Sequence, residues 1–159
     1  MNIRTTLKPG DLGTIIHLHG TLYEREYGLD YTFEGYVARG LGEFAIAYDP
    51  DKDFFAVAED DERIVGSVAI ARQADNVAQL RWFLVHPEAR GVGLGRRLLE
   101  DAVKFSREKG FTKVILWTIS ELKPAIHLYR SVGFHLAEQH THEIWGAEHT
   151  EERYEMLLE

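Results

Sequence analysis

The stretch Val85–Glu100, VHPEARGVGLGRRLLE, places three glycines at alternate positions between an apolar run and a helical pattern. The apolar residues before it predict a strand, and the leucines after it recur at helical spacing. Glycines let a ligand approach the backbone, and the free amides at a helix N-terminus point toward negative charge. The stretch therefore predicts a turn that binds an anion. A tight strand-to-helix connection with solvated arginines is the simpler alternative.

The flanking arginines favour phosphate as the anion. Arg90, Arg96 and Arg97 supply donors that suit phosphate oxygens. A dinucleotide fingerprint, G-x-G-x-x-G, would have its third glycine one residue later than Gly95, and it would open a βαβ unit. The strand before this turn instead closes a series of hairpins. We therefore expect a phosphorylated ligand other than a nicotinamide or flavin dinucleotide.

The composition is that of one domain covering residues 1–159, with 45% apolar residues. No apolar run approaches the roughly 20 residues that cross a bilayer, and the N-terminus has no apolar signal core, so we expect no membrane partner. The absence of cysteine suits a cytoplasmic location. A net charge of −8 disfavours nucleic acid as a partner, although acidity also serves simply to keep a protein in solution.

Turn residues and hydrophobic periodicity predict the element order β-αα-βββ-α-β-α-ββ. This order describes an α/β domain with a mixed, mostly antiparallel sheet. The expected elements are a strand at 3–7, a helix at 12–28 with Asp11 as its N-cap, a helix at 31–48, strands at 54–58, 64–71 and 77–85, a helix from 94 to Gly110, a strand at 113–118, a helix at 124–131, and strands at 134–144 and 153–158.

Two segments resemble the GCN5-related N-acetyltransferase (GNAT) family. Arg90–Gly95, R-x-x-G-x-G, resembles its acetyl-CoA signature, and Ala125–Phe134, AIHLYRSVGF, resembles its second segment, A-x-x-L-Y-x-x-x-G-F. The expected element order is also that of the GNAT fold. The resemblance implies an enzyme that transfers acetyl from acetyl-CoA directly to a primary amine of a small molecule or a side chain. A homodimer is a fair expectation for such a protein.

A narrower likeness lies nearer the N-terminus. His17–Gly20, HLHG, followed by Tyr23 and Glu26–Gly28, is similar to the acetyltransferase half of proteins that carry a MarR-type DNA-binding domain. We expect no such domain in this chain, because the remaining length leaves no room for one. The likeness supports a second hypothesis, in which the chain is a module that senses acetyl-CoA or CoA with little turnover.

The resemblance also implies which residues bind the cofactor. The diphosphate would lie on the glycine turn, and the pantetheine arm would pair with the end of the preceding strand. The implied residues are Leu84, Val85, Arg90, Gly91, Val92, Gly93, Leu94, Gly95 and Arg96. Leu122 stands where the family often has asparagine, so Ser120 becomes the candidate for the missing hydrogen bond.

Tyr129 occupies the family position of the general acid, and packing in the core is its alternative role. The general base is not identified. Many relatives place a carboxylate on the strand before the glycine turn, but Gln79 and Arg81 stand there in this chain. Glu26 and His19, which share a face of the first helix, are candidates, and a chain of water molecules serves equally well.

The end of the first helix is the candidate acceptor site. Tyr23, Glu26 and Tyr27 combine a carboxylate with aromatic faces, which suits a cationic acceptor, although core aromatics and a solvated acid fit the pattern equally well. We expect no metal site, because the two histidines of HLHG lie roughly 200° apart on a helix and the pair at 140 and 142 lacks a third ligand.

Overall fold

The computed structural model describes residues 1–159 and contains one seven-stranded sheet with strand order β1-β2-β3-β4-β5-β7-β6. Neighbouring strands are antiparallel except β4 and β5, so the prediction of a mixed, mostly antiparallel sheet is confirmed. In chain order the elements are β1 (Asn2–Arg4), α1 (Asp11–Tyr27), α2 (Tyr31–Ile46), β2 (Phe54–Asp60), β3 (Arg63–Ala74), β4 (Val77–Val85), the short 3-10 helix Pro87–Ala89, α3 (Leu94–Glu108), β5 (Lys113–Ile119), α4 (Lys123–Val132), β6 (His135–Ile144) and β7 (Ala147–Leu157).

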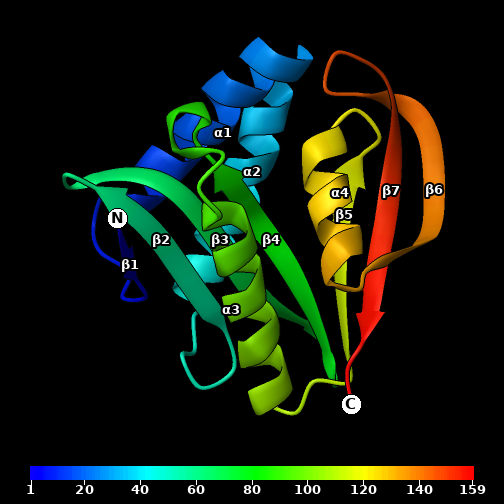
Figure 1. The fold of residues 1–159 in the computed structure, drawn as a ribbon. Coiled ribbons are helices and arrows are strands. Elements are labelled where there is room, and N and C mark those ends of the chain that lie inside the picture. The colour runs from blue at the N-terminus through cyan, green and yellow to red at the C-terminus, as the bar shows by residue number, and fades with distance from the viewer.

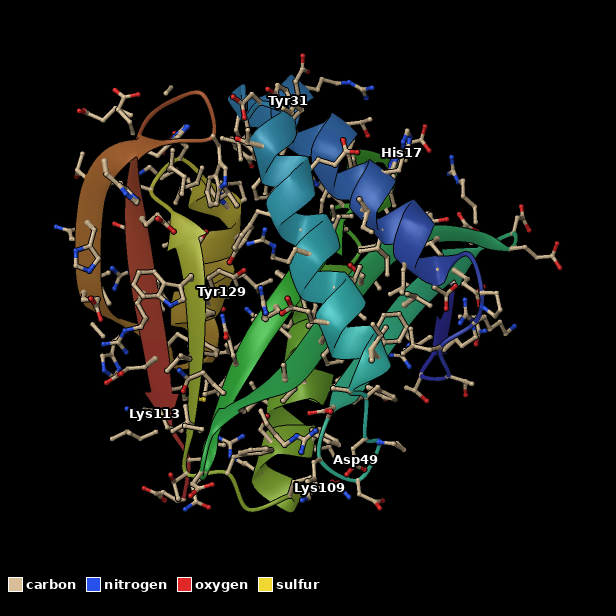
Figure 2. The ribbon with its side chains drawn as sticks, turned by 180° about the vertical axis from the view of Figure 1, so that it is seen from behind. His17, Tyr31, Asp49, Lys109, Lys113 and Tyr129 are labelled. Carbon is tan, nitrogen blue, oxygen red and sulfur yellow. The ribbon has the colours of Figure 1, made fainter.

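Helices cover both faces of the sheet. Figure 1 shows α3 and α4 on the near face, and Figure 2, from behind, shows α1 and α2 crossing the other. Each face has its own apolar core. Leu98 and Ile126 belong to the core beneath α3 and α4, while Ile15 and Val37 belong to the core beneath α1 and α2. The sheet therefore separates two packed layers, and a ligand can enter where neighbouring strands of the sheet separate.

The start of α1 differs from the prediction. Gly10, with a left-handed φ of 93°, is the N-cap, and Asp11 is the first helical residue, buried at 4% exposure. The prediction of Asp11 as N-cap is wrong because its carboxylate is held elsewhere, by Nη1 and Nη2 of Arg4 at 2.8 and 2.9 Å. The first strand is also shorter than expected, and the last begins earlier because it pairs with β6 from Ala147 onward.

The ion pair between Arg4 and Asp11 predicts a pH-dependent stability. Burial alone would raise the pKa of Asp11, but hydrogen bonds from Arg4 and from the Lys8 amide lower it below its usual value. We expect Arg4→Met to lower the free energy of unfolding by about 3 kcal/mol at neutral pH. Since the folded-state pKa is lowered, this contribution is complete above pH ~4 and is lost as the pH falls through the folded-state pKa.

Urea unfolding of the wild type and of Arg4→Met at pH 7 and pH 3 measures this contribution. The two proteins should differ clearly at pH 7 and less at pH 3, where protonation of Asp11 in the unfolded state already removes part of the contribution. Arg63→Met is the matched control, because Arg63 pairs with Glu88 on the surface, where an ion pair contributes about 1 kcal/mol or less. A difference that stays constant between the two pH values would show that the Asp11 carboxylate is not its source.

Candidate active site

Strands β4 and β5 part soon after they meet. Their parallel pairing comprises three residue pairs, from Val77 with Lys113 to Gln79 with Ile115. Figure 1 shows the two strands diverging beyond this point. The edge of β4 from Leu80 to Val85 therefore has no partner strand on the β5 side, and its main-chain groups are free to bind a ligand.

A bulge in β4 sets the direction of the side chains at this opening. Four residues of β4, from Arg81 to Leu84, lie opposite three of β3, from Ser67 to Ala69, and Trp82 adopts a left-handed φ of 49°. Such a conformation costs about 1–3 kcal/mol in a bulky residue. It is supported by the hydroxyl of Ser67, which donates to the Trp82 carbonyl at 2.7 Å. As a result Arg81 and Trp82 both lie against α2, where a Cβ at Gly40 would meet each of them.

The glycine turn follows β4 and opens α3. Gly91 and Gly93 have left-handed φ values of 84° and 83°, and a Cβ on either would meet open space, so the backbone conformation is what requires glycine. Gly95 is required for a different reason, since a Cβ there would lie 3.3 Å from Leu128 and 3.4 Å from Phe83. The turn thus leaves the N-terminal amides of α3 accessible.

These amides face a cavity of about 380 Å³, the cofactor cavity of the following text. Eight of the nine residues of the predicted set on the strand end and turn line it: Leu84, Val85, Arg90, Gly91, Gly93, Leu94, Gly95 and Arg96. Val92 does not, since its side chain is 68% exposed. Ser120 is not brought to the cavity either; its hydroxyl donates to Glu121. Pro124, Ala125 and Leu128 of α4 complete the wall.

Arg90 and Glu26 form the strongest polar contact in the cofactor cavity. Nη1 and Nη2 of Arg90 each donate to a carboxylate oxygen of Glu26 at 2.8 Å, and Nε donates to the Val85 carbonyl at 3.0 Å. Hydrogen bonding by Arg90 lowers the pKa of Glu26, so its carboxylate stays charged and is a poor proton acceptor. Arg96, the second cation, donates to the Ser131 hydroxyl at 2.8 Å.

A second cavity of about 110 Å³, here named the acceptor cavity, lies between the sheet and the α1–α2 layer. Tyr23, Phe83 and Leu122 line both cavities, so the two meet at these side chains. Of the residues predicted for the acceptor, only Tyr23 reaches this cavity. Glu26 and Tyr27 line the cofactor cavity alone.

His19 lines the acceptor cavity with its side chain almost wholly buried, at 3% exposure. Its Nδ1 lies 2.8 Å from the Ile15 carbonyl, which can only accept, so Nδ1 carries the hydrogen and Nε2 keeps its lone pair. Burial lowers the pKa of His19 to about 4, and the imidazole is therefore neutral at pH 7. The ring of Tyr23 stacks on it at 5.5 Å.

Tyr129, on α4, also lines the acceptor cavity, and Figure 2 shows it in the middle of the molecule. Its ring packs against Phe83, Phe134 and Tyr154 at centroid distances of 5.7, 6.0 and 6.5 Å. Burial raises the pKa of its phenol well above the usual value, so the hydroxyl keeps its proton at physiological pH. The ring is anchored in the core while its hydroxyl has no hydrogen bond within the chain.

Sequence reasoning missed most of the acceptor cavity. Its walls include Phe33 and Tyr36 from α2 and Trp145 from the turn between β6 and β7. Trp145 packs on these two rings at 5.0 and 5.6 Å, although it lies more than a hundred residues away in the chain. Arg81 and Glu151 are the charged residues of the lining. No spacing in the sequence connects these positions, and only the folded sheet brings them together.

Two kinds of feature are not found in the structure. No three or more histidine, aspartate or glutamate side chains are grouped so that they could hold a metal ion. None of the helices has the length and apolar character that crossing a membrane requires.

Known proteins are similar to this chain in sequence and in fold. The model of the acetyltransferase (GNAT) family matches residues 18–134. An uncharacterized N-acetyltransferase of Schizosaccharomyces pombe is 31% identical over 122 residues, which cover 76% of this chain and 74% of that protein. Human N-acetyltransferase 8B is 32% identical over 97 residues, 58% of this chain and 43% of that protein, so the match spans less than half of its length.

A solved structure supports the same fold. The structure of yncA from Salmonella typhimurium with its cofactor acetyl-CoA superimposes with a TM-score of 0.75 at 21% identity, covering 100% of this chain and 94% of that one. The order of helices and strands, the glycine turn at the start of α3 and the family match are consistent with one another. The chain belongs to the acetyltransferase (GNAT) family and is an N-acetyltransferase.

Proposed function

We propose that the chain transfers acetyl directly from acetyl-CoA to a primary amine of a small molecule or a side chain. The observation that carries this proposal is the meeting of the cofactor cavity and the acceptor cavity at Tyr23, Phe83 and Leu122, next to Tyr129. An amine in one cavity and a thioester in the other would meet there, and alignment of two reactants is a large part of acyl-transfer catalysis. No covalent nucleophile is needed.

The residues of the cofactor cavity fit acetyl-CoA, which supplies an activated thioester when bound. The amides of Gly91 to Arg96 and the guanidinium of Arg96 suit its diphosphate. Leu84 and Val85, on the unpaired edge of β4, suit the amides of its arm. Arg90 would turn from Glu26 toward the diphosphate, because both anions compete for the same guanidinium.

Tyr129 is proposed as the general acid. Its phenol stays protonated in the apolar cavity and can donate to the departing sulfur. Burial also raises the pKa of a thiol, which brings the acidities of donor and acceptor closer together. The hydroxyl would therefore stabilise the leaving group at the point where negative charge develops.

Removal of the amine's proton is assigned to water, with His19 as a positioning residue. Glu26 lines the cofactor cavity and not the acceptor cavity, which argues against its role as base. A histidine with a pKa of about 4 holds a proton poorly at pH 7, but its Nε2 can accept a hydrogen bond from the amine. The ammonium group of the acceptor would lose its proton to water in this cavity. The neutral amine, hydrogen-bonded to Nε2 of His19, would then face the thioester.

Release of CoA thiol from acetyl-CoA across a panel of primary amines tests the proposal. The expected result is thiol release that depends on the amine and yields the N-acetyl product in equal amount. Tight binding of acetyl-CoA with no amine-dependent release would instead support the sensor hypothesis, which the likeness to MarR-linked acetyltransferase domains raised. The N-acetyl product is identified by mass, so hydrolysis of the thioester cannot be mistaken for transfer.

A further inference from the structure

Resting on the proposed function, we infer that the acceptor is an α-amino acid or a conjugate with a free carboxylate on an apolar body, and that Arg81 binds this carboxylate. Arg81 lines the acceptor cavity from β4, on the same face of the sheet as Trp82. It is a guanidinium in a cavity whose other walls are largely aromatic and aliphatic. A positive charge in such apolar surroundings calls for an anionic partner.

Arg81 differs from the other partly buried arginines in having no anionic partner. Arg4 and Arg153 are each paired with a carboxylate, and so are the more exposed Arg72 and Arg90. The side chain of Arg81 forms no ion pair or hydrogen bond with the chain, and it lies on the face of Trp82, at 4.4 Å from the ring centroid. A half-buried guanidinium in an apolar cavity gains from an anionic partner, and a carboxylate from outside would supply the partner that the chain does not provide.

The surroundings of Arg81 hold its side chain in place for such a ligand. The β4 bulge turns Arg81 and Trp82 to the same face, and the indole supports the guanidinium plane. Above it, α2 presents Gly40, where a Cβ would lie 2.8 Å from Nη2 of Arg81 and 3.2 Å from the Trp82 ring. Glycine therefore makes room for the stacked arginine. A guanidinium fixed in this way loses little freedom when it binds a carboxylate through two parallel hydrogen bonds.

A second polar group of the same cavity also lacks a partner. The Thr118 hydroxyl, on β5, is buried and makes no hydrogen bond. A buried hydroxyl without a partner is destabilising, and a ligand oxygen or nitrogen in the cavity would satisfy it once a shift of the Thr118 side chain opens the hydroxyl to the cavity. Two unsatisfied polar groups, on the strands that diverge at this opening, are the pattern expected of a binding cavity for a polar ligand.

The remaining charges decide between acceptor classes. Glu151 is the carboxylate of the lining, and its Oε1 lies 2.5 Å from Nε2 of His142. His19 is neutral, which leaves Arg81 as the fixed positive charge. A polyamine would meet repulsion from Arg81, whereas an amino acid would place its carboxylate on Arg81 and its side chain among the aromatic rings of Phe33, Tyr36 and Trp145.

Matched pairs of amines test the inference. L-phenylalanine is compared with 2-phenylethylamine, and L-leucine with 3-methylbutylamine, in the wild type and in Arg81→Gln at saturating acetyl-CoA. A bidentate, charge-assisted contact should make kcat/KM of the wild type about 10- to 100-fold higher for the amine with the carboxylate. Arg81→Gln should reduce this preference to near unity, chiefly by raising KM for the amine with the carboxylate. Arg81→Lys should restore only part of it.

Arg39→Gln is the control, because Arg39 is an exposed arginine of α2 that lines neither cavity, and its replacement changes the net charge equally. It should retain the wild-type preference. Acetylation of both amines of a pair at equal rates by the wild type would overturn the inference while leaving the proposed function intact. Survival of the preference in Arg81→Gln would overturn the role of Arg81.

Binding of the products gives a measurement that does not need turnover. In the presence of CoA, N-acetyl-L-phenylalanine should bind the wild type about 10-fold or more tightly than N-acetyl-2-phenylethylamine, and Arg81→Gln should bind the two equally. Equal binding to the wild type would contradict the inference. Selective binding without any amine-dependent thiol release would support it and count against the proposed transfer reaction alone.

Discussion

Replacing Gly93 with glutamate should weaken acetyl-CoA binding by about 100-fold or more, measured by isothermal titration calorimetry. Gly93 is the N-cap of α3, its φ is 83°, and a Cβ there would enter open space at the cofactor cavity. A glutamate would place a negative charge beside the amides that suit the diphosphate, and like charges in such a site repel strongly. It would also impose about 1–2 kcal/mol of backbone strain.

Gly110→Glu separates charge repulsion from backbone strain. Gly110 has a φ of 82°, equally open surroundings and a place just after the other end of α3, about 20 Å away along the helix. The strain is therefore the same, while the added carboxylate is far from the cavity. This variant should lose stability but bind acetyl-CoA like the wild type. Affinity of Gly93→Glu within threefold of the wild type would refute the diphosphate assignment.

Removing one hydroxyl, in Tyr129→Phe, should lower kcat by about 100-fold, the lower end of what a general acid contributes. The hydroxyl makes no hydrogen bond with the chain, and the ring contacts with Phe83 and Phe134 remain, so the melting temperature and the affinity for acetyl-CoA should hardly change. Steady-state kinetics with a slow amine, for which chemistry limits the rate, together with calorimetry measures both effects.

Tyr154→Phe is the corresponding control. Tyr154 packs on Tyr129, is buried at 1% exposure and lines neither cavity, while its hydroxyl donates to Glu152 at 3.1 Å. Loss of that hydroxyl should leave kcat unchanged and affect stability alone. If Tyr129→Phe keeps full turnover under conditions where chemistry limits the rate, Tyr129 is a packing residue and the acid is elsewhere.

Local signals were enough to predict much of the fold. Gly28 and Gly133, predicted as helix ends, are the left-handed C-caps of α1 and α4, because few other residues adopt that conformation. The glycine turn was also predictable, since three glycines at alternate positions indicate both its left-handed conformation and its close packing against other elements. The N-cap of α1 was not, because the ion pair that occupies Asp11 comes from Arg4 on another element.

The acceptor cavity lay beyond the reach of sequence patterns for the same reason. Its lining comes from the three helices α1, α2 and α4, the three strands β4, β5 and β7, and the β6–β7 turn, and its relation to the cofactor cavity depends on where β4 leaves β5. The sequence shows that positions 79 and 81 carry glutamine and arginine in place of a carboxylate, but it does not show what Arg81 does in the site. Only the stacking of Arg81 on Trp82 beneath Gly40 shows that this position faces the acceptor cavity.

The short junction between β4 and β5 has a consequence for the chemical cycle as a whole. Three residue pairs between β4 and β5 join the two halves of the sheet, and the rest of the β4 edge has no partner strand in the chain. A pantetheine arm lying there would take the place of a missing strand, so the backbone hydrogen bonds of this edge are made to a partner other than water only while the cofactor is held. Every turnover would then include the loss and renewal of these hydrogen bonds, and product release would return the edge of β4 to water.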